Sequence, residues 1–200
     1  MLMNYIRSKM IKEVKENLSS KRFCHTMNVV SMAEKLGANY GLRGEEVFLA
    51  ALYHDYAKEL PDDYLVEYVY RNGLDHDSIS DSNPYLYHGL VAAHICQSKG
   101  YINTLSSYNA IRYHTTGYIH LDLLGKVIFV ADAVEISRNY QTVDFLRRLA
   151  FKDLDKACLK VLEHTILFLK RYDKPVHPNS IKFKIYLSNL LGGNNIWENI

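Results

Sequence analysis

The sequence is poor in the residues that define several classes of protein. It contains three cysteines and four prolines in 200 residues, and Cys24, Cys96 and Cys158 are widely spaced, without a CxxC pair. An odd number of isolated cysteines argues against a disulfide framework and against a thiolate zinc site, and it is typical of a reducing compartment. We therefore expect a cytoplasmic protein.

Long apolar runs and an excess of charge are also missing. The longest strongly apolar run, residues 127–131, stops at Asp132 and is far shorter than the roughly 20 residues that cross a bilayer. The first residues lack the charged start and apolar stretch of a signal peptide. The formal net charge is only +2. We therefore expect neither a membrane nor a nucleic-acid partner, and an anionic ligand must be held by local cations.

Most of the chain shows the period of an α-helix. Polar/apolar alternation bounded by tight turns is scarce, so a sheet is not expected. An Asp/Ser/Asn-rich segment, 74–84, is predicted to be a loop that borders a site. The predicted fold is all-α, an irregular helical bundle in a single domain over 1–200, with a core of about 18–140 and C-terminal helices of about 141–192 packing on it. Helices are predicted at roughly 3–17, 20–39, 44–57, 62–72, 86–99, 104–115, 121–138, 142–148, 153–171 and 178–191.

The strongest local signal is the pair His54-Asp55 within an apolar segment. On a helix, the apolar face that begins at Val47 leads to this pair and then to Lys58. Burying an imidazole, a carboxylate and an ammonium group without partners costs several kcal/mol. A metal ion offsets this cost because it binds the imidazole nitrogen and the carboxylate oxygen together. The alternative is a surface His-Asp pair near a helix end.

Two further residues lie on apolar helical segments. His25 continues an apolar stripe with Val29, which suits either a metal ligand or a hydrogen-bonded core histidine. Asp132 follows five apolar residues, and an ionised carboxylate on so apolar a helix must be paired or bound to metal. The alternative for Asp132 is a structural salt bridge to Arg138 or Lys126.

Two more histidines complete a pattern. His88 begins one predicted helix and His114 ends another, so the order along the chain is H, HD, H, H, D. Four imidazoles and two carboxylates can hold two metal ions if one carboxylate bridges. Two ions about 3.5–4 Å apart share a hydroxide and stabilise the attacking and leaving oxygens at a phosphorus centre. The predicted ligands of such a dinuclear centre are His25, His54, Asp55, His88, His114 and Asp132.

Several motifs together resemble a known family. They are residues 21–26, the HDxxK core within 50–58, Tyr87-His88-Gly89, His114-Thr115-Thr116-Gly117, 128–135 followed by Arg138, and 149–157. Over about residues 10–190 the chain resembles the HD superfamily of metallophosphohydrolases, and more closely the bacterial symmetrical diadenosine tetraphosphate hydrolases. The resemblance implies an HD-domain helical bundle that cleaves diadenosine tetraphosphate into two ADP at a dinuclear metal centre. Iron is the expected metal, and manganese, cobalt and zinc accept the same ligands.

The resemblance also implies roles for individual residues. One metal ion is held by His25, His54, Asp55 and Asp132, and the second by His88 and His114, with Asp55 bridging. The expected catalytic residues are Lys58, Asp55 and Arg22. The expected substrate contacts are Arg22, Lys58, Thr115, Thr116, Gly117, Glu135 and Arg138. The chain departs from the family at Ile136-Ser137, where Pro-Gly is usual, and in the stretch 181–186, which lacks the Asn that is common in the family's last helix. Both departures bear on substrate preference more than on the metal centre.

Other interpretations of the same residues remain open. The substrate can be another nucleotide, such as a deoxynucleoside triphosphate, a nucleoside monophosphate or an alarmone, and product analysis separates these cases. A different class of protein is a non-catalytic sensor that binds metal and nucleotide. The oligomeric state is open from the sequence, and a homodimer is favoured only mildly, as the commonest assembly. The remaining histidines are expected to be solvated or locally hydrogen-bonded: His76, His94, His120, His164 and His177.

Overall fold

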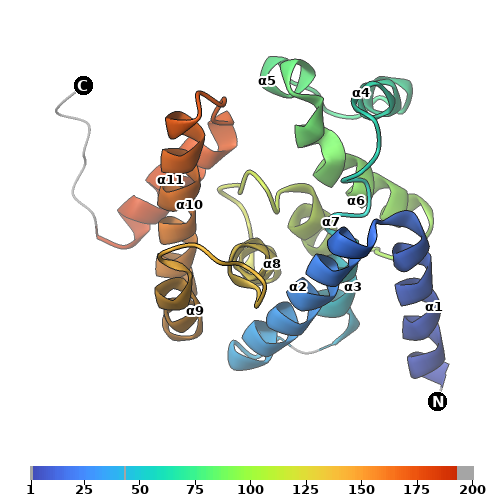
Figure 1. Cartoon of the computed structure of the whole chain (residues 1–200), viewed down its shortest axis with the longest axis horizontal. Coiled ribbons are helices and arrows are strands. Elements are labelled where there is room, and N and C mark those ends of the chain that lie inside the picture. The colour runs from blue at the N-terminus through green and yellow to red at the C-terminus, as the bar shows by residue number, and fades with distance from the viewer. Residues whose placement is uncertain (1, 43, 193–200) are drawn as a thin grey trace.

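The computed structural model describes residues 2–42 and 44–192, and within them it is a bundle of α-helices without a β-strand (Figure 1). The predicted all-α fold class is confirmed. No helix in this part of the chain is long and apolar enough to cross a bilayer. The elements, in order, are α1 (Leu2–Asn17), α2 (Ser20–Asn39), α3 (Glu45–Tyr53), α4 (Asp62–Arg71), α5 (Ser78–Ser82), the 3-10 helix η1 (Pro84–Tyr87), α6 (His88–Ser98), α7 (Leu105–Arg112), α8 (Leu123–Val134), α9 (Val143–Lys152), α10 (Leu154–Arg171) and α11 (Pro178–Leu190).

Helix α8 is the centre of the bundle. Its N-terminus is capped by Asp122, whose side chain accepts a hydrogen bond from the backbone N–H of Gly125 at 3.0 Å. Residues 127–131 are all buried. The helix packs against α2 and α7 on one side and against α10 on another (Figure 1). These contacts on several sides explain why its sequence is apolar nearly all round.

Two close helix pairs bring the histidine-bearing segments together. Helix α2 packs along α3, so the side chain of His25 approaches the end of α3. Helices α6 and α7 touch at Gly89, where an added Cβ would lie 2.6 Å from the carbonyl oxygen of Arg112. Only glycine permits so close a backbone approach. His88, the residue before it, is thereby held near the C-terminal end of α7.

The first difference from the predicted elements is at the His-Asp pair. Helix α3 ends at Tyr53, so the predicted helix 44–57 was too long. His54 and Asp55 lie in tight turns, marked by backbone hydrogen bonds from Tyr56 to Tyr53 at 3.1 Å and from Lys58 to Asp55 at 2.9 Å. These bonds span three residues rather than four, so Lys58 does not continue the helical face that was predicted.

Other boundaries differ as well. The predicted loop 74–84 contains α5 and the start of η1, so the loop assignment was wrong there. The carboxylate of Asp77 accepts hydrogen bonds from two backbone N–H groups at 3.0 Å and so starts the short helix. Helix α8 ends at Val134 and not at 138, because the chain turns at Glu135. His114 lies beyond the end of α7 rather than within it.

The C-terminal helices pack on the rest of the bundle. Helix α10 lies against α8, α9 and α11 (Figure 1). The end of α2 is tied to α9, since Asn39 donates to the carbonyl of Phe151 at 2.9 Å and Tyr40 donates to the carbonyl of Ala150 at 2.7 Å. The division into a core of 18–140 and C-terminal helices of 141–192 stays a prediction. Helix α10 nevertheless lies where it can contribute to a site beside α8.

A polar cluster joins α1 to the turn that carries the His-Asp pair. The carboxylate of Glu13 accepts hydrogen bonds from the hydroxyls of Tyr101 at 2.8 Å, Tyr56 at 2.9 Å and Tyr53 at 3.3 Å. It also forms an ion pair with Lys99 at 2.5 Å. Tyr53 and Tyr56 flank the His-Asp pair, so α1 holds this turn in place.

Candidate metal centre

The predicted ligands converge on one carboxylate. Asp55 Oδ2 lies 3.5 Å from Nε2 of His54 and 3.7 Å from Nε2 of His25. Asp55 Oδ1 lies 3.3 Å from Nε2 of His88 and 3.4 Å from Nε2 of His114. Asp55 therefore faces two pairs of imidazoles, one pair with each of its oxygens.

Asp132 completes the first of these groups. Its Oδ1 lies 3.0 Å from Nε2 of His25. In the second group, the Nε2 atoms of His88 and His114 are 3.1 Å apart. Ligand atoms lie within 4.8 Å of one another in three sets, namely His25 with His54 and Asp55, His54 with His114 and Asp132, and Asp55 with His88 and His114. The six residues predicted from the sequence form one continuous cluster.

Each imidazole is also oriented by a hydrogen bond at Nδ1, the ring nitrogen that does not face the cluster. An Nδ1–H that donates to an acceptor fixes the tautomer in which the lone pair is on Nε2, as in metal-binding histidines generally. The acceptors are the carbonyls of Ala51 for His54 at 2.6 Å, Tyr85 for His88 at 2.5 Å and Ile111 for His114 at 2.7 Å, and the Glu135 carboxylate for His25 at 3.1 Å.

The cluster fits a metal ion by its own chemistry. The Nε2 atoms of His25 and His54 are buried without a hydrogen-bond partner among the described residues. They face carboxylate oxygens, which are acceptors too, so lone pairs meet lone pairs unless a cation lies between them. Neutral imidazoles and carboxylates are ligands that iron, manganese, cobalt and zinc accept. The residues present therefore fit a metal centre.

Burial and neighbouring charges keep these groups in the ligand form. Burial, together with the nearby ammonium of Lys58, lowers the pKa of His88 to about 4. Burial alone would raise the pKa of Asp55, but the imidazoles around it hold that pKa well below its ordinary value. A neutral imidazole and an ionised carboxylate are the forms that bind metal.

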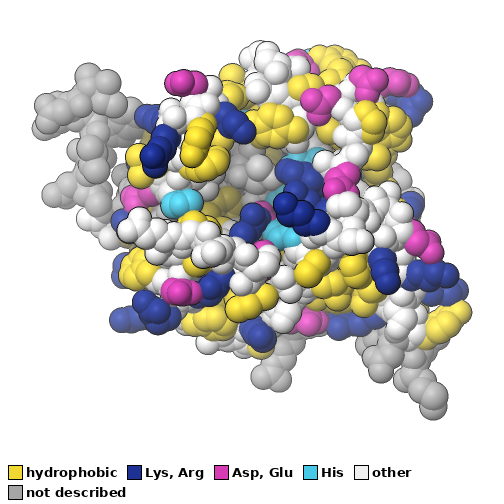
Figure 2. Space-filling view, in the orientation of Figure 1, with side chains coloured by type: hydrophobic (Ala, Val, Ile, Leu, Met, Phe, Trp, Pro, Cys, Tyr) yellow, Lys and Arg dark blue, Asp and Glu magenta, His cyan; other side chains and the backbone are white. Residues whose placement is uncertain are grey.

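Three cations surround the cluster. Arg22 Nη1 lies 2.8 Å from Asp55 Oδ2, and Arg138 Nη2 lies 2.6 Å from Asp132 Oδ1. Lys58 Nζ lies 3.3 Å from Nε2 of His88. Figure 2 shows Lys and Arg side chains framing histidines at the bottom of a hollow. The salt bridge of Asp132 to Arg138, which was the structural alternative to a ligand role, is present together with the contact of Asp132 to His25.

The remaining predicted residues lie in three different places. Thr115 is at the cluster, with its hydroxyl oxygen 3.0 Å from Nε2 of His114. Glu135 is fully buried behind His25. Thr116 and Gly117 face α11 instead, because the Thr116 carbonyl accepts a hydrogen bond from Ser180 at 2.7 Å. The structure thus brings Thr115 to the cluster but not Thr116 or Gly117.

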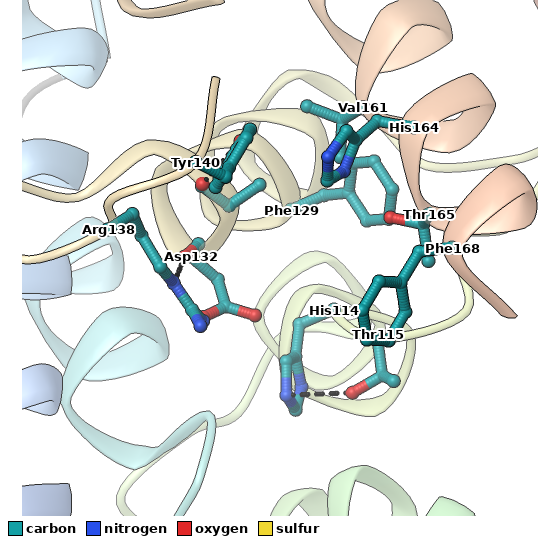
Figure 3. Close-up of a pocket in the computed structure, with 11 residues that line it drawn as sticks. His114, Thr115, Phe129, Asp132, Arg138, Tyr140, Val161, His164, Thr165 and Phe168 are labelled. Carbon is teal, nitrogen blue, oxygen red and sulfur yellow. Dashed lines mark hydrogen bonds and ion pairs between the residues drawn. The ribbon is translucent and has the colours of Figure 1, made fainter. Parts of the chain in front are cut away.

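A cavity beside the cluster involves residues that the sequence did not reveal. It has a volume of about 290 Å³, lies between α8 and α10, and is bordered by Asp132 and His114 of the cluster (Figure 3). His164, which was expected to be solvated or locally hydrogen-bonded, lines this cavity and stacks on Tyr140 with ring centroids 4.4 Å apart. The only signal in the sequence is the helical spacing of His164 and Phe168, which also suits an ordinary amphipathic face.

A helical bundle that places a His-Asp pair at the middle of a histidine-rich cluster is the architecture of the HD domain, and the family model for the HD domain matches residues 22–137. The chain belongs to this family.

Within this family, the chain is similar over most of its length to individual proteins of three bacteria. The chain is similar to a protein of Bacillus subtilis (strain 168) named symmetrical bis(5'-nucleosyl)-tetraphosphatase, with 35% identity over 84% of this chain and 89% of that protein. A protein of the same name from Halalkalibacterium halodurans is 33% identical over 88% of this chain and 93% of its own length. A crystal structure from Clostridium acetobutylicum, described as a predicted HD superfamily hydrolase involved in NAD metabolism, has a TM-score of 0.88 and 33% identity, covering 92% of this chain and 97% of that one.

Proposed function

We propose that the protein is a metal-dependent phosphohydrolase that cleaves diadenosine tetraphosphate symmetrically into two ADP. The observation that carries this proposal is the position of Asp55, whose two oxygens each face a pair of imidazoles, with Arg22, Lys58 and Arg138 around them. The two bacterial relatives named as symmetrical bis(5'-nucleosyl)-tetraphosphatases support the choice of substrate.

Two ions would divide the ligands according to the oxygen of Asp55 that each ligand faces. His25, His54 and Asp132 would hold one ion on the side of Oδ2, and His88 and His114 would hold the other on the side of Oδ1. When bound, two such ions supply an activated water and neutralise charge at phosphorus. Iron is the metal that we expect here, and manganese, cobalt and zinc share its ligand preferences.

The two arginines are placed to hold the phosphate chain. A guanidinium group has five N–H donors in a fixed fork. Arg22 contacts Asp55 through one nitrogen, and Arg138 contacts Asp132 through two. The donors left over on each side chain match phosphate oxygens, which a guanidinium group binds in pairs. The arginines therefore orient the substrate while they also hold the carboxylates of the cluster.

Lys58 is suited to the departing half of the substrate. In symmetrical cleavage a water oxygen bonds to one of the two inner phosphorus atoms, the bond to the central bridging oxygen breaks, and the second ADP leaves with an added negative charge. The Lys58 ammonium is largely buried and lies beside His88, without an ion pair to a carboxylate in the described part of the chain. A desolvated cation at this place stabilises the charge that develops on the leaving diphosphate.

The test is anaerobic turnover of diadenosine tetraphosphate by iron- or manganese-loaded protein, with the products separated by anion exchange. We expect ADP as the sole product, and loss of turnover in Asp55→Ala. Asp144→Ala is the matched control, because the Asp144 side chain is 76% exposed and is not one of the residues that form the cluster. Release of inorganic phosphate or pyrophosphate from another nucleotide, without turnover of the dinucleotide, would overturn the substrate assignment. Tight nucleotide binding without turnover in any metal would indicate a sensor.

A further inference from the structure

The cavity between α8 and α10 differs in chemistry from the metal cluster that it adjoins. The rings of Phe129, Tyr140 and Phe168 line it, and Phe168 remains 49% exposed (Figure 3). Tyr140 is fixed by its hydroxyl, which donates to the carbonyl of Ala133 at 2.9 Å. The cavity is therefore an aromatic slot with ordered walls, and we use this term for the space between Phe129, Tyr140, His164 and Phe168.

Two polar side chains in the slot have hydrogen-bonding capacity that the protein does not use. The His164 imidazole stacks on Tyr140 at an interplanar angle of 25°. Neither its ring nitrogens nor the hydroxyl of Thr165 form a hydrogen bond within the described part of the chain. Apolar walls with a few free polar groups are typical of a site that binds a flat heterocycle.

We propose that the aromatic slot binds the purine base of one nucleoside of the substrate, an inference that rests on the proposed function. The slot is continuous with the metal cluster, because His114, Asp132 and Arg138 also line it. The ribose and phosphates attached to a base in the slot would therefore extend toward the cluster around Asp55. The volume of about 290 Å³ holds one base, and a whole dinucleotide needs several times this space.

The other half of the substrate meets different surroundings. A second cavity of about 750 Å³ adjoins Arg138 as well, and both cavities share Arg138 and Tyr140. Its lining is mostly charged and polar, including Lys21, Arg22 and Glu59. This cavity suits phosphates and a hydrated nucleoside rather than a stacked base. The site therefore recognises one base of the two.

Three of the four residues that define the slot lie outside the part of the chain that matches the HD domain, and Phe129 lies inside it. The match ends at residue 137, and Tyr140, His164 and Phe168 all follow it. Base recognition thus combines Phe129 of α8 with α10 and the segment before α9, while the HD domain supplies the metal ligands. Substitutions in the slot should change nucleotide affinity without changing metal binding.

The test is calorimetric binding of ADP and of pyrophosphate to metal-loaded protein. Phe168→Ala should weaken ADP binding about tenfold, since a stacked base contributes that much, and should leave pyrophosphate affinity and metal content unchanged. His164→Phe keeps an aromatic ring against Tyr140 but removes the polar atoms, and we expect ADP to bind about fivefold more weakly. Phe145→Ala is the matched control, because Phe145 is 51% exposed on α9 and lies outside the slot.

The outcomes separate this inference from the proposed function. Unchanged ADP affinity in Phe168→Ala would overturn the slot, and so would equal weakening of ADP and pyrophosphate. If the wild type turns over diadenosine tetraphosphate but Phe168→Ala leaves KM unchanged, the slot is wrong and the function stands. If the wild type shows no turnover, and Phe168→Ala binds ADP more weakly than the wild type but pyrophosphate equally well, the slot stands and the function is wrong.

Discussion

Nδ1 of His25 lies 3.1 Å from a carboxylate oxygen of Glu135, whereas the other three imidazoles of the cluster are held from behind by backbone carbonyls. Glu135 is fully buried and also accepts a hydrogen bond from the backbone N–H of Ser137 at 2.6 Å. A carboxylate behind an imidazole increases its basicity toward a metal more than a neutral carbonyl does. His25 is therefore the ligand whose strength depends on a side chain.

Replacing that side chain should weaken the metal centre. Glu135→Gln keeps the size of the residue and removes its charge, so we expect metal affinity to fall about tenfold. Competition with a chelator of known affinity measures the change. Glu163→Gln, at a surface salt bridge with Lys160 on α10, is the control. Unchanged affinity in Glu135→Gln would show that the contact with His25 is merely structural.

Lys58 should affect the rate rather than the metal content. Lys58→Met keeps the apolar stem in its buried position and removes the ammonium that faces His88. We expect kcat to fall about 100-fold, as for the loss of one preorganised electrostatic group, with full metal occupancy. Steady-state kinetics and metal analysis on the same preparation check this. A parallel fall in metal content would assign Lys58 to the structure of the centre instead.

Gly117 should matter for stability. It has φ of +68°, and an added Cβ would lie 2.5 Å from Cδ1 of Phe183. Gly117→Ala therefore combines backbone strain of about 1–2 kcal/mol with overpacking that costs about 1–3 kcal/mol. Gly73→Ala is the control, because Gly73 has φ of +60° but nothing within 4 Å of the added Cβ. Urea unfolding should show the larger loss for Gly117→Ala, and equal losses would refute the contact with Phe183.

Glu13 should make the stability depend on pH. Burial opposes its ionisation, but hydrogen bonds from Lys99 and the tyrosines lower its pKa below the ordinary value of 4.5. The stabilisation is therefore complete above pH 4.5 and is lost as the pH falls through the lowered pKa. Glu13→Gln should be less stable than the wild type at pH 7, and the difference should shrink in acid. Urea unfolding at several pH values tests this, with the exposed Glu16→Gln as control.

The ligand set was predictable because its chemistry is visible in the chain. Asp132 interrupts an apolar helix, and His54-Asp55 ends an apolar segment. An ionisable group in such a place needs a partner whatever the detailed fold. The helical period also predicted α2 and α10 closely, because long amphipathic or buried helices depend little on tertiary detail.

The arrangement around the ligands was not predictable in the same way. The tight turns at His54 and Asp55 depend on contacts from α1, through Glu13 and through Asn17, which donates to the carbonyl of Tyr56 at 2.6 Å. Such contacts join residues about 40 positions apart, and periodicity carries no information about them. The role of His164 likewise depends on the packing of α10 against α8. A single histidine on an amphipathic helix has the same sequence pattern whether or not a cavity lies before it.

The aromatic slot has a consequence for the regiochemistry of cleavage, that is, for which of the two inner phosphorus atoms receives the water oxygen. Diadenosine tetraphosphate has two interchangeable ends, whereas one slot beside a metal cluster has no such symmetry. Either adenosine can therefore enter first, and the two encounters are equivalent. In a dinucleoside tetraphosphate with one purine and one pyrimidine nucleoside, the two binding orientations differ. Both orientations nevertheless yield the same pair of nucleoside diphosphates. Product composition then hides the orientation, but reaction in heavy-oxygen water would reveal it, since the label enters only one of the two diphosphates when a single orientation is used.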